Sequence, residues 1–126
     1  MTYRTPLARV RGLGSAKEGT DHFWKQRLTA VSNLILVCFL IWLLARLAGA
    51  DYATVKQTLG KPQNAILLLL LVLSGVVHMR LGMQTIIEDY VHSEGRKVVA
   101  LMLNSFFAIL VGLTSVFAVL KLSLGA

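Results

Sequence analysis

The chain has 126 residues, of which 56% are hydrophobic and 15% charged, and its formal net charge is +7. A mean hydropathy of +0.67 is too high for a soluble domain of this size, which needs a charged surface. One cysteine and two prolines exclude a disulfide scaffold and a proline-rich linker. A single thiolate cannot hold an iron–sulfur cluster and no dinucleotide-binding glycine motif is present, so we expect no cluster or flavin in this chain.

The N-terminal segment, residues 1–27, is polar and basic. No short apolar core precedes the first long hydrophobic run, so a secretory signal peptide is not expected. Arg4, Arg9 and Arg11 all precede Glu18, and this composition weakly resembles an organellar transit peptide. A mitochondrial location therefore stays open as an alternative.

Three long runs of uncharged residues follow. They are Leu28 to Ala45 with 18 residues, Pro62 to Met79 with 18, and Val98 to Leu120 with 23. About 20 such residues cross a hydrocarbon core. The pattern predicts one all-α membrane domain, 1–126, with three transmembrane helices at about 28–48, 62–84 and 98–120. We expect a loop over 49–61, with Pro62 in the first turn of the second helix.

Lysine and arginine are distributed unevenly between the two sides of the membrane. Nine fall in the N-terminal segment and the second connection, namely Arg4, Arg9, Arg11, Lys17, Lys25, Arg27, Arg80, Arg96 and Lys97. The other side has four, namely Arg46, Lys56, Lys61 and Lys121. Because such residues collect on the cytoplasmic side, the N-terminus is predicted to be cytoplasmic and the C-terminus periplasmic. No basic patch interleaved with aromatic residues supports a nucleic-acid partner.

The second helix carries a stripe of small and polar residues centred on His78. Its members lie at offsets of −4, −3, +4, +7 and +11 residues, within about 60° of one line along a helix. They are Ser74, Gly75, Gly82, Thr85 and Asp89. The stripe continues past the apolar run, so we expect the helix to protrude into the cytoplasm as far as Tyr90. Gly95 is expected to end the helix or to break the loop after it.

His78 is the main candidate for chemistry, because an ionisable residue inside a transmembrane helix is costly to bury. Its imidazole could simply bond a backbone carbonyl, or it could bind haem iron, with the flanking glycines leaving room for the macrocycle. His92 lies about 21 Å further along a continuous helix, and His22 precedes the first span. A second axial ligand would therefore come from another polypeptide.

Two further candidates lie at the cytoplasmic surface. Tyr90 and Asp89 suit a membrane interface, but the Tyr90 hydroxyl could also donate to a quinone carbonyl while Asp89 orients a proton path. Arg27 suits an interface anchor beside Trp24, but its guanidinium could also pair with a haem propionate.

Together these residues resemble the hydrophobic membrane-anchor subunits of succinate dehydrogenase, a succinate:quinone oxidoreductase, in their alphaproteobacterial form. The segment HMRLGMQTIIEDYV from His78 matches the family's haem-ligating histidine, the glycine four residues later and the Asp-Tyr pair eleven and twelve later. The segment QRLTA from Gln26 is similar to the Arg-x-Thr-Ala that opens the first helix in this family. Residues 4–19 and 88–95 also look like bacterial members. The chain departs from the family around Phe23 and His22, so His22 receives no role.

The resemblance implies a four-subunit complex of the bacterial inner membrane, complex II of the tricarboxylic acid cycle. A flavoprotein would oxidise succinate, an iron–sulfur subunit would relay electrons, and this chain with a second anchor subunit would bind haem b and ubiquinone. His78 would be an axial ligand of the haem iron, with Gly82 beside the haem and Arg27 at a propionate. Tyr90 and Asp89 would form the quinone site.

Two other functions stay open at this point. A fumarate reductase anchor would share the chemistry and run it in reverse. A structural three-helix membrane protein would need neither haem nor quinone.

Overall fold

The computed structural model describes residues 5–12 and 19–125. The described helices are α1 (Pro6–Val10), α2 (Gly19–Leu47), α3 (Tyr52–Gly60), α4 (Pro62–Tyr90) and α5 (Glu94–Leu124). Arg4, Lys17 and Glu18, which entered the sequence-based expectations, lie outside the described residues, as do residues 13–16 of the 4–19 segment.

Three of these helices are long and apolar enough to cross a membrane, and they are α2, α4 and α5. The predicted all-helical fold with three transmembrane helices is therefore confirmed. Each helix is longer than its predicted span, since α4 has 29 residues and α5 has 31. At 1.5 Å per residue α4 is about 43 Å long, more than the roughly 30 Å of a hydrocarbon core. Both helices therefore extend beyond the apolar layer, and α4 reaches Tyr90 as expected.

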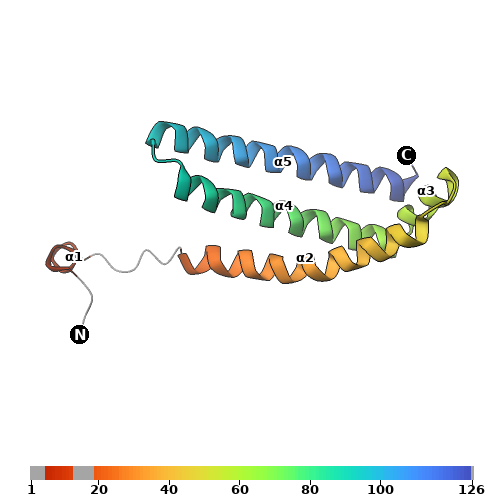
Figure 1. Ribbon diagram of the computed structural model, residues 1–126, viewed down its shortest axis with the longest axis horizontal. Helices are drawn as coiled ribbons and strands as arrows, with labels where there is room; N and C mark the ends of the chain where they lie inside the picture. The colour runs from red at the N-terminus through yellow and green to blue at the C-terminus, as the bar shows by residue number, and fades with distance from the viewer. Residues whose placement is uncertain (1–4, 13–18, 126) are drawn as a thin grey trace.

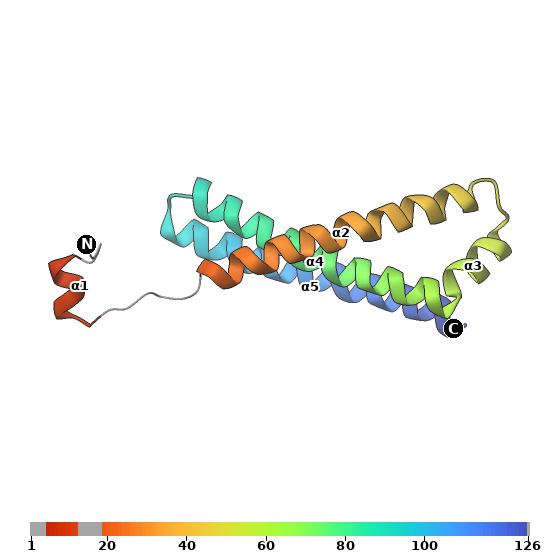
Figure 2. The ribbon, with the colours of Figure 1, turned by 90° about the horizontal axis from the view of Figure 1, so that it is seen from below.

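Helix α4 lies in the middle of the bundle, between α2 and α5 (Figure 1). The N-terminal end of α2, the C-terminal end of α4 and the start of α5 share one end of the bundle, and α3 lies at the other end with the C-terminus (Figure 1). Figure 2 shows that α2 crosses α4 and then diverges from it toward α3. The hydrogen bonds between α2 and α4 involve Thr29, in the N-terminal half of α2.

The hydrophobic core inside the described part of the chain is small. Its buried apolar side chains are Leu36, Leu43, Ala65, Ile87 and Ala108. Most large apolar side chains of the three long helices remain exposed, among them Phe106, Leu113 and Phe117. Lipid does not penalise this exposure, because acyl chains are as apolar as the side chains themselves.

The connection 49–61 corrects one expectation, because it contains helix α3 where a loop was predicted. Gly49, with φ +79°, follows the end of α2, and α3 packs on α5 and α4. At Gly60 a Cβ atom would lie 2.6 Å from the backbone oxygen of Leu122, so only glycine allows this close approach. Asp51 precedes α3, and the Thr54 hydroxyl is the main reason that the pKa of its carboxyl lies below the usual value.

The second connection corrects another expectation. Helix α4 ends at Tyr90 and α5 begins at Glu94, so Gly95 lies in the first turn of α5 and neither ends α4 nor breaks the loop. The turn consists of residues 91–93, with extended backbone at Val91 and Ser93.

Candidate functional site

A hydrogen-bonded contact joins α2 to α4 at His78. The Thr29 hydroxyl oxygen lies 3.1 Å from His78 Nδ1, 2.7 Å from the carbonyl oxygen of Lys25 and 3.1 Å from that of Gln26. One turn away, the Ser74 hydroxyl donates to the carbonyl oxygen of Thr29 at 3.4 Å. Thr29 therefore contacts α4 through both its side chain and its backbone.

These distances fit one tautomer of His78. The Thr29 hydroxyl has one proton, and a carbonyl oxygen of its own helix, that of Lys25, is the shortest acceptor. With that proton on the Lys25 carbonyl, the Thr29 oxygen can accept a hydrogen from Nδ1 of His78, in the tautomer that leaves an electron pair on Nε2. Within the described residues, Nε2 has no hydrogen-bond partner.

The side chains around His78 leave open space beside it. A Cβ atom at Gly75 would meet nothing within 4 Å, and one at Gly82 would have its nearest contact at 3.8 Å, with Gln26 Nε2. The packing of this chain on itself therefore requires neither glycine. Further along α2, Asn33 Oδ1 is buried without a hydrogen-bond partner in the described part of the chain. Buried polar atoms in native proteins are normally paired, so Asn33 Oδ1 is an exception among the described residues.

The structure does not bring Arg27 into contact with His78. Arg27 is two residues from Thr29, about 200° around the helix, so it faces away from α4. Its guanidinium carbon lies 4.3 Å from the centroid of the Phe23 ring. Within the described residues its guanidinium forms no ion pair with a carboxylate.

His22 lies on the same side of α2 as Thr29, seven residues earlier and about 10 Å along the axis. Its Nε2 atom is buried without a partner among the described residues. His92 is exposed in the connection after α4. Neither histidine is placed beside His78, in agreement with the spacing argument.

Tyr90 and Asp89 form the cytoplasmic end of α4 in the predicted orientation, about 18 Å along the helix from His78. The Tyr90 side chain is 77% exposed, and Asp89 is exposed too. A cavity of about 320 Å³ lies at this end and is lined by Tyr90, His92, Arg96 and two apolar neighbours. Acidic residues at a helix C-terminus are unfavourable because the helix dipole is negative there, and α4 has no basic residue in its last turn to offset them.

Sequence reasoning missed Thr29 as the partner of His78 and missed Asn33 altogether. Thr29 lies in the QRLTA segment that resembles the family's Arg-x-Thr-Ala, but the sequence alone assigned it no role. Periodicity along one helix gives no register against another helix, so the pair becomes visible only when α2 and α4 are packed.

This geometry defines a class of protein. It is a multi-pass helical membrane protein whose middle helix carries an oriented histidine at membrane depth and a polar end at the surface.

Comparison with known proteins places the chain within that class. Residues 1–114 match the family described as succinate dehydrogenase/fumarate reductase transmembrane subunit. The succinate dehydrogenase hydrophobic membrane anchor subunit of Paracoccus denitrificans is 33% identical over 126 residues, covering 100% of this chain and 97% of that protein. The subunit of the same name from Rickettsia bellii (strain RML369-C) is 31% identical over 122 residues, covering 93% and 98%. The succinate dehydrogenase membrane anchor subunit of Reclinomonas americana is 32% identical over 96 residues, covering 74% and 80%.

The chain belongs to the succinate dehydrogenase/fumarate reductase transmembrane subunit family. The resemblance found in its sequence is thereby confirmed, and so is its location as a multi-pass protein of the inner membrane. No solved structure matches the chain.

Proposed function

We propose that this chain is the anchor subunit that, together with a second anchor subunit, binds haem b and ubiquinone and holds a flavoprotein and an iron–sulfur subunit at the membrane. The complex would transfer electrons from succinate to ubiquinone. The names of the relatives favour succinate oxidation over fumarate reduction, because each is a succinate dehydrogenase subunit.

The observation that carries the haem proposal is the hydrogen bond between His78 Nδ1 and Thr29. A histidine that binds a metal usually donates its other ring N–H to a fixed acceptor, which orients the ring and sets its tautomer. His78 has that arrangement, with Nε2 left as the ligating atom. The open space at Gly75 is a further feature that fits a bulky group from outside this chain.

In this proposal His78 is one axial ligand, Gly82 borders the haem, and the second axial ligand comes from the other anchor subunit. Arg27, which has a free guanidinium near the same end of α2, is proposed for a haem propionate. When bound, the haem would accept and donate single electrons. Thr29 would hold the His78 ring so that Nε2 keeps its electron pair for the iron.

Tyr90 and Asp89 are proposed as the quinone site. A phenol hydroxyl is a neutral donor to a quinone carbonyl. The hydrogen bond becomes stronger as negative charge develops on the quinone oxygen during reduction. The unfavourable position of Asp89 at a helix C-terminus, without a stabilising contact, is typical of a residue kept for function. The exposure of both side chains leaves them accessible to the quinone and to a docking iron–sulfur subunit.

Purification of the tagged chain in mild detergent tests the proposal. A flavoprotein, an iron–sulfur protein and a second anchor subunit should accompany it, and the reduced-minus-oxidised spectrum should show low-spin haem b. His78→Ala should abolish or weaken that spectrum, whereas the matched control His92→Ala, in the exposed connection, should leave it unchanged. An unaltered bis-imidazole spectrum in the His78→Ala complex contradicts the ligand assignment, and a complex without any haem favours the purely structural anchor.

A further inference from the structure

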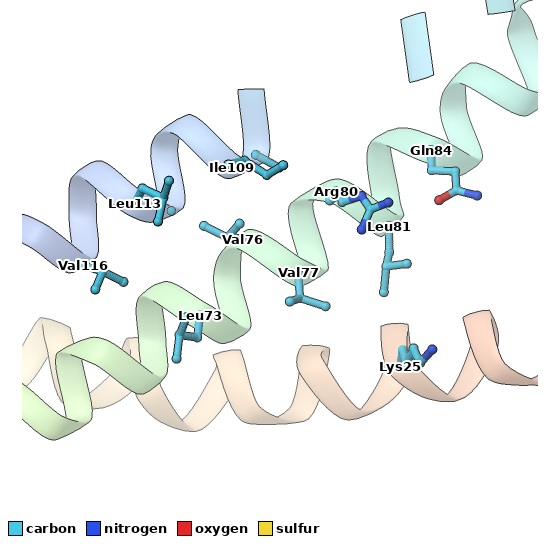
Figure 3. A pocket seen from close by; sticks show the side chains of 12 residues that line it. Lys25, Leu73, Val76, Val77, Arg80, Leu81, Gln84, Ile109, Leu113 and Val116 are labelled. Carbon is cyan, nitrogen blue, oxygen red and sulfur yellow. The ribbon is translucent and has the colours of Figure 1, made fainter. Parts of the chain in front are cut away.

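One cavity among the described residues lies between α4 and α5 and is not lined by His78. It has a volume of about 530 Å³, and its apolar wall combines Leu73, Val76 and Val77 of α4 with Ile109, Leu113 and Val116 of α5 (Figure 3). Arg80, which also lines it, is two residues from His78 and so lies about 200° around the helix. The cavity is therefore on the face of α4 opposite to the proposed haem site.

Small residues of α5 make this depression possible. Ala108 is 1% exposed, and a Cβ atom at Gly112 would already touch Val76 at 3.5 Å. The two helices are therefore in close contact at these small residues, and the larger side chains on either side form the walls of a groove. From Leu73 to Gln84 it follows α4 over eleven residues, about 16 Å.

The polar side chains of the cavity gather at one end of it. Figure 3 shows Lys25, Arg80 and Gln84 toward one end of the groove, with Leu73 and Val116 toward the other. That polar end is on the side of the membrane predicted to be cytoplasmic. The groove thus has two cationic side chains, Lys25 and Arg80, at its predicted cytoplasmic end, and, apart from Gln84, its remaining lining is apolar and extends toward the membrane interior.

Neither cation is neutralised by a strong partner. Lys25 Nζ lies 3.8 Å from Asp21 Oδ2, but both side chains are more than half exposed, so this pair is weak. Arg80 is exposed and forms no ion pair in the described part of the chain. Gln84 donates to Glu88 at 2.8 Å and keeps a second amide hydrogen free.

We propose that this groove binds one anionic phospholipid. Its phosphate would lie between Arg80 and Lys25, and one acyl chain would lie along the apolar wall of α4 and α5. A guanidinium binds a phosphate with two parallel hydrogen bonds, and an ammonium adds a point charge. The cytoplasmic leaflet supplies anionic lipids, and juxtamembrane lysines and arginines attract them. Charge complementarity selects this occupant. A zwitterionic lipid brings a headgroup cation together with its phosphate and a neutral quinone brings no charge, so neither offers the net negative charge that the two cations attract.

The first test measures bound lipid in the intact complex. The complex is purified in mild detergent, exchanged into micelles that contain either phosphatidylglycerol or phosphatidylcholine, and examined by native mass spectrometry. Wild type should retain one phosphatidylglycerol per copy of this chain more firmly than phosphatidylcholine. The double variant Lys25→Gln/Arg80→Gln should bind that lipid about 25-fold more weakly, at roughly fivefold for each lost charge.

A matched variant controls for a general loss of positive charge. Arg46→Gln removes an exposed arginine at the other end of α2, where its guanidinium carbon lies 4.6 Å from the Trp42 ring centroid. It should retain phosphatidylglycerol as wild type does. Equal retention in the double variant overturns the proposal, and so does equal retention of the two lipids by wild type.

The second test uses the native charges, so it does not depend on the folding of the double variant. A photo-crosslinking amino acid is introduced in place of Leu113, which is 66% exposed and lines the groove. Irradiation of the complex with phosphatidylglycerol should add the mass of one lipid to this chain. A crosslink to another subunit would mean that a protein helix covers the groove, and the proposal would be wrong.

Discussion

Thr29 provides the sharpest test of how this protein prepares His78. Thr29→Val keeps the shape of the side chain and removes the hydroxyl that lies 3.1 Å from His78 Nδ1. A hydrogen bond between neutral groups contributes about 0.5–1.5 kcal/mol, and loss of an outer partner of a metal-bound histidine lowers affinity about 10- to 100-fold. We expect haem to bind at least about tenfold more weakly in the variant, with the chain still inserted in the membrane.

The measurement is the rate of haem transfer from the purified complex to an excess of a haem-accepting apoprotein, followed by absorbance. Thr29→Ser keeps the hydroxyl, so this variant should lose haem as slowly as wild type. Thr85→Val is the matched control, because the Thr85 hydroxyl bonds only to Leu81 of its own helix, at 3.2 Å. If Thr29→Val and wild type lose haem at the same rate, Thr29 does not orient His78 and the tautomer argument is refuted.

Three further predictions concern the rest of the chain. Tyr90→Phe should lower quinone affinity several-fold, because it removes one hydrogen bond of about 0.5–1.5 kcal/mol. Succinate oxidation by an artificial dye should stay normal. Unchanged quinone reduction at subsaturating quinone would make Tyr90 an interface residue. A reporter fused after Ala126 should lie in the periplasm, and a cytoplasmic signal would reverse the orientation predicted from lysine and arginine. In a thermal melt of the purified complex, Gly60→Ala should be destabilising by about 1–3 kcal/mol, because the new Cβ would lie 2.6 Å from the Leu122 oxygen. The control Gly95→Ala has open space around the new Cβ and should be neutral or slightly stabilising.

The sequence predicted those parts of the fold that depend on local composition. Uncharged runs of about 20 residues located the three long helices, and Pro62 marked the start of α4 as observed. Helix α3 was missed because its residues, which end at Gly60, have the polar and glycine-containing composition of a loop. Its packing on α5, which involves residues more than 60 positions away, could not be read from that composition.

The candidate site was predictable to a similar extent. The position of His78 on its stripe followed from helical periodicity, and the Asp89–Tyr90 pair followed from its spacing to that histidine. The hydrogen-bond partner of His78 Nδ1 could not be predicted in this way, because it depends on how α2 crosses α4. The direction of Arg27 was not predicted either. It is only two residues from Thr29 in sequence, but two residues correspond to about 200° around a helix, so Arg27 points to the opposite side.

The divergence of α2 from α4 has a consequence for the life of the subunit in the cell. The described part of the molecule buries only five apolar side chains, and just two of them, Leu36 and Leu43, belong to α2. Free energy that other domains obtain from their own core must here come from binding, so the stability of the fold rises with the concentration of its partners. Newly made copies that find no partner are expected to be degraded, and the level of this subunit should then follow that of the subunit in shortest supply.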